Sequence, residues 1–318
     1  MTKDKKKILL VALGGNALIR KGQQGTVKEQ FENLKLPVSQ IAKLSKKYKI
    51  IITHGNGPQV GDLLLQQECC DAAPRLPLEI LVAQTQGQIG YMIESTLDSE
   101  LMSMGIQTHQ RIVSLLSYVV VDENDPAFKE PTKPIGPVFT EQEVFTEQKT
   151  EKLPYPVKKT AKGFRRVVVS PRPVTIVVKR EIKTLINMDF IVICCGGGGI
   201  PVIRDGRRFN GVDAVIDKDL ASATLAKEVG VDIFVIASDV SGAALNYGTD
   251  KQEFLRHLTV FDAKKHFNQG HFPQGSMGPK IEACIEVMEK KRKRAVICSI
   301  EDIEKAVSGN AGTEIIND

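Results

Sequence analysis

Long apolar runs are missing from the sequence. The first apolar stretch, Ile8–Leu13, follows the basic segment MTKDKKK and is short. A secretory signal needs about 7–15 apolar residues, and a membrane-spanning helix needs about 20. We therefore expect a cytoplasmic protein that has no membrane partner.

Cysteine is sparse and is not spaced for zinc binding or for a disulfide framework. The six cysteines form two adjacent pairs and two single positions, without a CxxC motif or a nearby histidine. We expect reduced thiols without a catalytic role. A redox-sensing role stays open for the adjacent pairs, although apolar packing is favoured for the pair on a predicted strand. The cysteines are Cys69, Cys70, Cys194, Cys195, Cys284 and Cys298.

Charge of one sign does not dominate the chain. The 318 residues include 43 basic and 38 acidic ones, which gives a net charge of +5, far from a polybasic balance. Residues 158–183 are locally basic, with Glu181 as their only acidic residue. That stretch is either a phosphate-attracting rim or a solvated face, and the solvated face is favoured. We expect no nucleic-acid partner.

The common nucleotide-binding and catalytic motifs are also absent. GxGxxG fails because Val60 and Pro201 stand where the third glycine would fall, and no Gly-Lys dipeptide exists for a Walker A loop. HRD, DFG, HExxH and GxSxG do not occur either. These absences exclude the typical dehydrogenases, P-loop enzymes, protein kinases, zincins and serine hydrolases.

What the sequence does contain is an alternation of short β-branched runs with longer segments of helical spacing. Most of the runs are apolar on both faces, as a parallel sheet covered by helices requires. The pattern predicts an α/β protein. The predicted strands are Ile8–Leu13, Ile50–Thr53, Ile112–Val121, Val174–Val178, Phe190–Cys195, Ile233–Ala237 and Ala295–Ser299. The predicted helices are Thr26–Lys47, Pro58–Gln67, Leu78–Met104, Lys179–Asn187, Asp217–Val229, Gly278–Lys291 and Glu301–Val307.

One segment, residues 122–165, breaks this rhythm. It holds six of the 15 prolines, many charges and few apolar runs. A structureless loop of that length is uncommon in a compact domain. We therefore predict one domain over residues 1–318, with residues 122–165 forming a small protruding lid subdomain.

Three glycine clusters follow predicted strands, and each one stands at the carboxyl end of its strand. They are Gly14-Gly15-Asn16, Gly55-Asn56-Gly57 and Gly196–Gly199. In an open parallel sheet this edge binds ligands, and loops without Cβ atoms let N–H groups approach phosphate oxygens. Each cluster alone is equally consistent with a tight turn. Three in one chain favour phosphate chemistry.

These motifs, taken in order along the chain, resemble the amino acid kinase family, and most closely its branch that transfers phosphate between ATP and carbamate. The resemblance implies a three-layer αβα open sandwich on a mostly parallel sheet of about eight strands. It also implies a homodimer that uses Mg²⁺ and ATP. The motifs are VALGGNAL (11–18), THGNGPQVG (53–61), QTQGQIGY (84–91), KPIGP (133–137), SPRP (170–173), CGGGGIPV (195–202), IDKD (216–219) and GSMGPK (275–280).

The implied reaction is ATP + carbamate = ADP + carbamoyl phosphate, run toward ATP in arginine fermentation by the arginine deiminase pathway. By this resemblance, Lys218 bridges the transferring phosphate, Asp219 orients the flanking lysines, Lys280 reaches the nucleotide phosphates, and Lys133 closes over the substrate from the lid. Phosphoryl transfer needs positioning and positive charge more than a general base. No protein side chain is assigned to the metal, so phosphates would hold Mg²⁺.

The resemblance also divides the remaining site residues between two sides. The N-terminal part would hold carbamate and the transferred group, and the part from about residue 190 to 318 would hold the nucleotide. On the first side are Gly14, Gly15, Asn16, Gly55, Asn56 and Gly57, and on the second are Gly197, Gly198, Asp239, Met277 and Lys280. Asp239 is equally well read as an Asx-turn residue.

One departure and several alternatives stay open. Related kinases of this fold carry a lysine two residues before the first Gly-Gly, where this chain has Ala12, so Lys133 would supply the missing charge. A hydrogen-bonding or packing role is expected for His54. The long predicted helix 78–104 is a candidate dimer face. The chain could instead act on acetylglutamate, uridylate or isopentenyl phosphate, or be a non-catalytic nucleotide sensor.

Overall fold

A computed structural model describes residues 6–69, 72–106, 111–144, 156–160, 163–273, 275–289 and 293–317. Its centre is an eight-stranded sheet in the order β15-β17-β16-β12-β1-β2-β9-β3. Six of these strands run parallel, while β17 lies antiparallel to β16 and parallel to β15. The prediction of a mostly parallel sheet of about eight strands is thus confirmed. The strands are β15 (His257–Thr259), β17 (Thr313–Ile316), β16 (Arg294–Ser299), β12 (Ile233–Ser238), β1 (Ile8–Leu13), β2 (Lys49–His54), β9 (Phe190–Ile193) and β3 (Arg111–Ser114).

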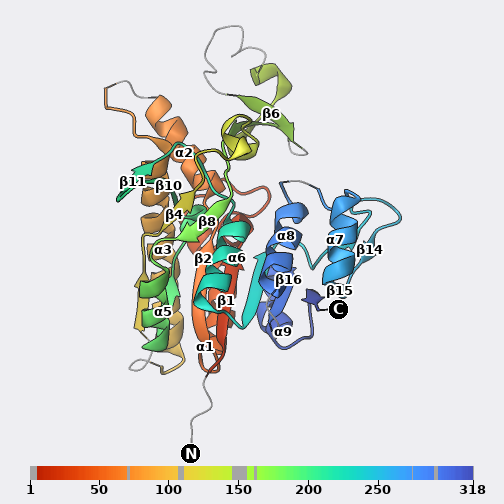
Figure 1. Cartoon of the computed structure of the whole chain (residues 1–318). Coiled ribbons are helices and arrows are strands. Elements are labelled where there is room, and N and C mark those ends of the chain that lie inside the picture. The colour runs from red at the N-terminus through yellow and green to blue at the C-terminus, as the bar shows by residue number, and fades with distance from the viewer. Residues whose placement is uncertain are drawn as a thin grey trace, which may run out of the picture.

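Helices cover both faces of this sheet (Figure 1). Alternate residues of β1 explain why: Leu10 and Ala12 pack with the helices of one layer, and Leu9, Val11 and Leu13 pack with those of the other. The result is a three-layer αβα sandwich, as predicted. One layer holds α5 (Lys179–Asn187), α6 (Lys218–Val229), α7 (Val260–Asn268) and α8 (Met277–Met288), and the other holds α1 (Val27–Ser45), α3 (Leu78–Ser103) and α9 (Ile303–Val307).

A second sheet lies beside the main one, in the order β11-β10-β4-β8. It corrects two predictions. The predicted single strand Ile112–Val121 is two strands, because the chain leaves β3 at Ser114 and enters this second sheet at Tyr118. The predicted strand Val174–Val178 is β8, which pairs antiparallel to β4 and lies outside the parallel sheet. The strands are β11 (Arg208–Gly211), β10 (Ile200–Asp205), β4 (Tyr118–Val121) and β8 (Pro173–Ile176).

A separate three-stranded antiparallel sheet projects beyond the main sheet, at the top of Figure 1. Its strands are β5 (Lys133–Phe139), β6 (Val157–Thr160) and β7 (Gly163–Val168). Its base is anchored, since Ile135 is fully buried in a hydrophobic cluster with Val60 of α2 (Gly57–Glu68). We call this unit the inserted sheet.

The remaining short elements were not predicted. A two-stranded ribbon pairs β13 (Ala244–Leu245) with β14 (Glu253–Phe254), and 3₁₀ turns occupy η1 (Gly15–Ala17), η2 (Pro126–Phe128), η3 (Gly196–Gly198) and η4 (Ile300–Asp302). Helix α7 was also missed. Among the described helices, none is both long enough and apolar enough to span a bilayer.

Candidate active site

The first two glycine loops meet at the carboxyl edge of the main sheet. The amide of Gly14 donates to the Ala237 carbonyl at 2.8 Å, and the amide of Gly55 donates to the Leu13 carbonyl at 3.1 Å. A Cβ atom at Gly55 would lie 3.4 Å from the Gly15 nitrogen and 3.3 Å from Cδ of Lys218. The two loops and Lys218 therefore border one site, and Asn16 lies half-buried in the turn that follows Gly15.

The third glycine loop packs against the second one. Gly197 has φ +64° and Gly198 has φ +91°, a region that favours glycine. A Cβ atom at Gly197 would lie 2.2 Å from Nδ2 of Asn56, and one at Gly196 would lie 2.3 Å from Nε2 of His54. Only glycine fits at these two positions, so this loop serves close packing between the loops.

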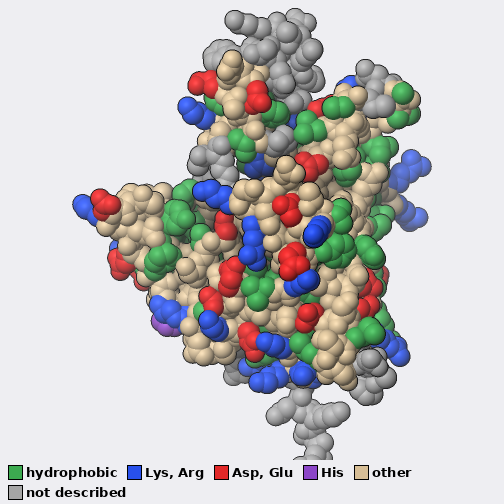
Figure 2. Space-filling model, turned by 180° about the vertical axis from the view of Figure 1, so that it is seen from behind, with side chains coloured by type: hydrophobic (Ala, Val, Ile, Leu, Met, Phe, Trp, Pro, Cys, Tyr) green, Lys and Arg blue, Asp and Glu red, His purple; other side chains and the backbone are tan. Residues whose placement is uncertain are grey.

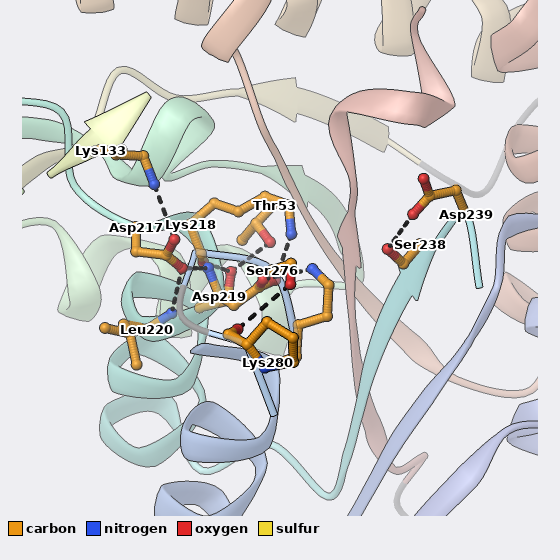
Figure 3. A network of polar contacts seen from close by, with 12 residues as sticks. Thr53, Lys133, Asp217, Lys218, Asp219, Leu220, Ser238, Asp239, Ser276 and Lys280 are labelled. Atoms are coloured by element: carbon orange, nitrogen blue, oxygen red, sulfur yellow. Dashed lines mark hydrogen bonds and ion pairs between the residues drawn. The ribbon is translucent and has the colours of Figure 1, made fainter. Parts of the chain in front are cut away.

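Charged residues of the site lie at the start of α6. Asp217 is the N-cap residue of this helix, and its Oδ1 accepts from the backbone amide of Asp219 at 2.9 Å. The other oxygen, Oδ2, accepts from Lys133 of the inserted sheet at 2.9 Å. One carboxylate thereby holds both the helix start and the lysine predicted for the lid (Figure 3).

The next carboxylate, Asp219, holds two lysines. Its Oδ1 accepts from Nζ of Lys218, and its Oδ2 lies 2.8 Å from Nζ of Lys280. All three side chains are largely buried, with exposures of 12%, 13% and 5% for Lys218, Lys280 and Asp219. Figure 3 shows both ammonium groups directed at this carboxylate. We call Lys218, Asp219 and Lys280 the lysine cluster.

The pKa values in the site follow from burial and charge together. Burial acts to raise the pKa of Asp219, but the charges of Lys218 and Lys280 outweigh it, so its pKa is lowered. The pKa of Asp217 is lowered well below its ordinary value, because Lys133 and the two lysines of the cluster outweigh burial. Both carboxylates are therefore ionised at neutral pH.

The two cluster lysines respond differently. Burial lowers the pKa of Lys218, and the charge of Asp219 only partly opposes this. For Lys280, the carboxylates of Asp219, Asp217 and Asp239 outweigh burial and raise the pKa. Lys218 is thus the less stabilised cation of the two, and a phosphate dianion beside it would relieve that cost.

The backbone of Lys218 is held by the buried hydroxyl groups of Ser222 and Thr53. Its carbonyl accepts from the Ser222 hydroxyl at 2.5 Å, and that hydroxyl lies 2.7 Å from Oγ1 of Thr53 at the end of β2. Thr53 and Ser222 are both fully buried. This contact joins the start of α6 to the strand that carries the second glycine loop.

Helix α3 holds the second and third loops from the other side. Thr85 accepts from the Asn56 side chain at 2.9 Å. Gln86 accepts from the Ser117 amide at 2.9 Å and donates to its carbonyl at 3.3 Å. Ser117 in turn accepts from the amide of Cys195 through Oγ at 3.0 Å, next to the Gly196–Gly199 run.

Thr85, Gln86 and Asp217 were missed as functional residues. The first two stand in the QTQGQIGY motif, and the third is the first residue of the predicted helix Asp217–Val229, where an Asp is typical of an N-cap. The motif and the N-cap pattern could therefore have indicated these residues. The sequence does not indicate which residue each side chain contacts.

Two residues predicted for the nucleotide side make no hydrogen bond or ion pair with the lysine cluster among the described contacts. Asp239 is exposed and accepts from the Ser238 hydroxyl at 3.1 Å, and Figure 3 shows this pair apart from the lysine cluster. Met277 is the first residue of α8 and packs partly against the core. Gly57 begins α2 beside Asn56, with open space where its Cβ would be.

His54 and the buried thiols of Cys194 and Cys298 are uncharged at neutral pH. Burial lowers the pKa of His54 to about 4, and its Nδ1 lies 3.1 Å from the Gly55 carbonyl. The thiols of Cys69, Cys194, Cys195, Cys284 and Cys298 are free, and Cys70 lies outside the described residues. A hydrogen bond with Cys195 and burial raise the pKa of Cys194 well above its ordinary value, and burial raises that of Cys298 to about 12.

Several basic side chains of the stretch 158–183 are paired with acidic residues. Lys158 pairs with Glu130 at 3.0 Å, and Arg166 pairs with Glu68 at 2.5 Å. Arg172 and Lys179 are likewise paired with glutamates. On the face shown in Figure 2, acidic and basic side chains are intermingled.

Glycine loops at the carboxyl edge of a parallel sheet, with two lysines on one carboxylate, are the features of a phosphoryl-transfer enzyme. The model of the amino acid kinase family matches residues 7–299, and the chain belongs to that family.

Similar proteins agree with this assignment. The carbamate kinase of Pyrococcus furiosus is 44% identical over 314 residues, which cover 98% of this chain and 99% of that protein. The structure of carbamate kinase from Giardia lamblia bound to citric acid has a TM-score of 0.92 and 38% identity, covering 98% of this chain and 99% of that one. The Giardia lamblia enzyme bound to AMP-PNP has a TM-score of 0.87 at the same identity and coverage.

Proposed function

We propose that the protein catalyses the reversible reaction ATP + carbamate = ADP + carbamoyl phosphate. The observation that carries the proposal is the lysine cluster facing the first two glycine loops. The full-length similarity to carbamate kinases supports the choice of substrate. Carbamate is small, so the site needs little beyond backbone N–H groups and cations to hold it.

In this reaction, the transferring phosphoryl group would lie between Gly15 and Gly55, next to Lys218. Lys218 and Lys280 would stabilise the charge that spreads over the phosphoryl oxygens in the transition state, and Asp219 would hold both lysines in place. Gly14 and Asn16 would complete the pocket for this group. No general base is needed, which is consistent with a neutral His54.

Lys133 is proposed to act from the inserted sheet. In the structure its ammonium group is held by Asp217 at 2.9 Å, beside the start of α6. A movement of the inserted sheet over the substrate would bring this charge to carbamoyl phosphate and exclude water. The lid boundaries 122–165 are part of this proposal.

The nucleotide is proposed to bind on the side formed by residues 190–318, near Gly197, Gly198, Asp239, Met277 and Lys280. The carboxylates of Asp217 and Asp219 are both paired with lysines. The described residues contain no cluster of three metal-ligating side chains. A Mg²⁺ ion would therefore be held mainly by phosphate oxygens, whose charge it would neutralise.

We further propose a cytoplasmic homodimer that works toward ATP in the arginine deiminase pathway. Carbamoyl phosphate is a mixed anhydride, which favours transfer to ADP. For the dimer, helix α3 carries the exposed apolar side chains Ile80, Tyr91 and Met102, at 41%, 65% and 58% exposure. Sedimentation of the wild type and of Tyr91→Glu tests this face. The wild type should sediment as a dimer and the variant as a monomer.

A substrate panel tests the activity. The purified protein with ADP, Mg²⁺ and carbamoyl phosphate should form ATP, while acetylglutamate, uridylate and isopentenyl phosphate should not be phosphorylated by ATP. Turnover of one of these three without carbamoyl phosphate activity would move the chain to another branch of the family. Nucleotide binding without any turnover would instead make it a nucleotide sensor.

A further inference from the structure

The direction in which the Asn56 side-chain amide points is fixed by two hydrogen bonds in series. Its Nδ2 donates to Oγ1 of Thr85 at 2.9 Å, and the Thr85 hydroxyl donates to the Val82 carbonyl at 2.8 Å. A carbonyl only accepts, so the single proton of the Thr85 hydroxyl is committed to Val82. The Thr85 oxygen can then only accept, and the NH₂ group of Asn56 must face it.

The opposite end of this amide is therefore an acceptor. The hydrogen bonds among the described residues engage Nδ2 and leave Oδ1 of Asn56 available. The side chain cannot turn freely, because it is only 2% exposed and packs against Gly197. Oδ1 is therefore held in place without a protein donor, and a ligand that brings a donor can supply the missing hydrogen bond.

Asn56 also has the right place in the site. It precedes α2 as the N-cap residue, and its side chain makes no capping bond. Its neighbour Gly55 borders Gly15 and Lys218. The free end of the amide thus belongs to the loop on which we place carbamate.

Carbamate and acetate differ in one group of similar size. Both are small carboxylates, but the amino group of carbamate donates hydrogen bonds and the methyl group of acetate does not. A site with an oriented acceptor rejects the analogue that lacks the donor, because the acceptor then stays unpaired.

We propose that Thr85 is a positioning residue that holds Oδ1 of Asn56 toward the substrate, and that this oxygen selects the amino group of carbamate over the methyl group of acetate. The inference rests on the proposed carbamate activity. It adds to that proposal the residue that distinguishes the substrate and the residue that orients it.

The test compares two phosphoryl donors to ADP. The ratio of kcat/KM for carbamoyl phosphate to kcat/KM for acetyl phosphate is measured for the wild type, Asn56→Leu, Thr85→Val and Thr85→Ser. Leu has nearly the shape of Asn but no acceptor, so its ratio should fall about 10- to 100-fold, mainly through carbamoyl phosphate. Val keeps the shape of Thr without the hydroxyl and should lower the ratio in the same direction. Ser keeps the hydroxyl and should restore the wild-type ratio.

The outcomes separate the two proposals. Thermal unfolding and ADP affinity establish that each variant is folded. A purely structural role of Thr85 would lower both activities together and leave the ratio unchanged, which would overturn the inference. An unchanged ratio in Asn56→Leu would do the same while the carbamate activity stands. A wild type that forms no ATP from carbamoyl phosphate would remove the proposed function and this inference together.

Discussion

The ammonium nitrogen of Lys280 lies 2.8 Å from Oδ2 of Asp219, a residue 61 positions earlier in the chain. The other oxygen of that carboxylate accepts from Lys218. One negative charge therefore holds two buried positive charges that would otherwise repel each other. The cluster keeps an excess of one positive charge, which suits a phosphate ligand.

Removal of the Asp219 charge should lower turnover while the shape of the site is kept. Asp219→Asn preserves the shape of the side chain but leaves Lys218 and Lys280 to repel each other, so we expect kcat to fall about 10²- to 10³-fold. Steady-state kinetics with ADP and carbamoyl phosphate measures this. Asp302→Asn is the control, because that carboxylate pairs with an exposed lysine on α9. Wild-type kcat in Asp219→Asn would contradict the role assigned to the cluster.

Loss of Lys218 should affect turnover far more than nucleotide binding. Its charge is needed mainly where negative charge develops during transfer, so Lys218→Ala should lower kcat strongly while the Kd for ADP changes little. Calorimetric titration of ADP alongside kinetics separates the two effects. An equal loss in both would mean that Lys218 only binds the nucleotide. Lys35→Ala, at an exposed surface pair, is the matched control.

Much of the fold was predictable from local pattern. Buried parallel strands such as Ile8–Leu13 and Ile233–Ser238 are continuous apolar runs, and the glycine clusters mark where strands end. Strand neighbours beyond this are set by tertiary packing. The run from Ile112 to Val121 looks continuous, yet it is interrupted between Ser114 and Tyr118, where Gln86 of α3 binds the Ser117 backbone.

The site was predictable in its residue types but not in its pairings. Lys133 and Asp217 are 84 residues apart, and nothing local in either segment indicates that they meet. Asp219 stands next to Lys218 in the sequence, so that contact had a local signal, while the contact with Lys280 depends on how α6 packs against α8. Contacts between residues so far apart in the sequence can be identified only from the three-dimensional arrangement of the helices and strands.

The contact between Gly61 and Gly136 should control the position of the inserted sheet. A Cβ atom at Gly61 would lie 2.0 Å from Cα of Gly136, so Gly61→Ala must push β5 and its first residue, Lys133, away from α2. We expect a higher KM for carbamoyl phosphate, a lower kcat and a loss of about 1–3 kcal/mol in stability.

The matched control for this substitution is Gly87→Ala on α3. Gly87 has open space where its Cβ would be, and Ala is the better helix former, so this variant should keep its activity and lose no stability. Kinetics and thermal unfolding of both variants decide the matter. If Gly61→Ala matched the wild type in KM, the backbone contact would have no part in placing Lys133.

The buried His54 should make stability depend on pH in a defined window. Burial lowers its pKa in the folded protein from 6.5 to about 4, so between these values the unfolded chain binds a proton that the folded chain does not. The free energy of unfolding should therefore fall as the pH drops from 6.5 to 4, by about 3 kcal/mol from this residue. Protonation of Asp217 and Asp219, whose pKa values are lowered from 3.8, reduces the free energy of unfolding further only below that value.

Denaturant unfolding of the wild type and of His54→Gln between pH 4 and 8 isolates the contribution of the histidine, because the variant should show a flatter profile above pH 4. Parallel profiles for the two proteins would mean that His54 is protonated in the folded state as readily as in the unfolded chain.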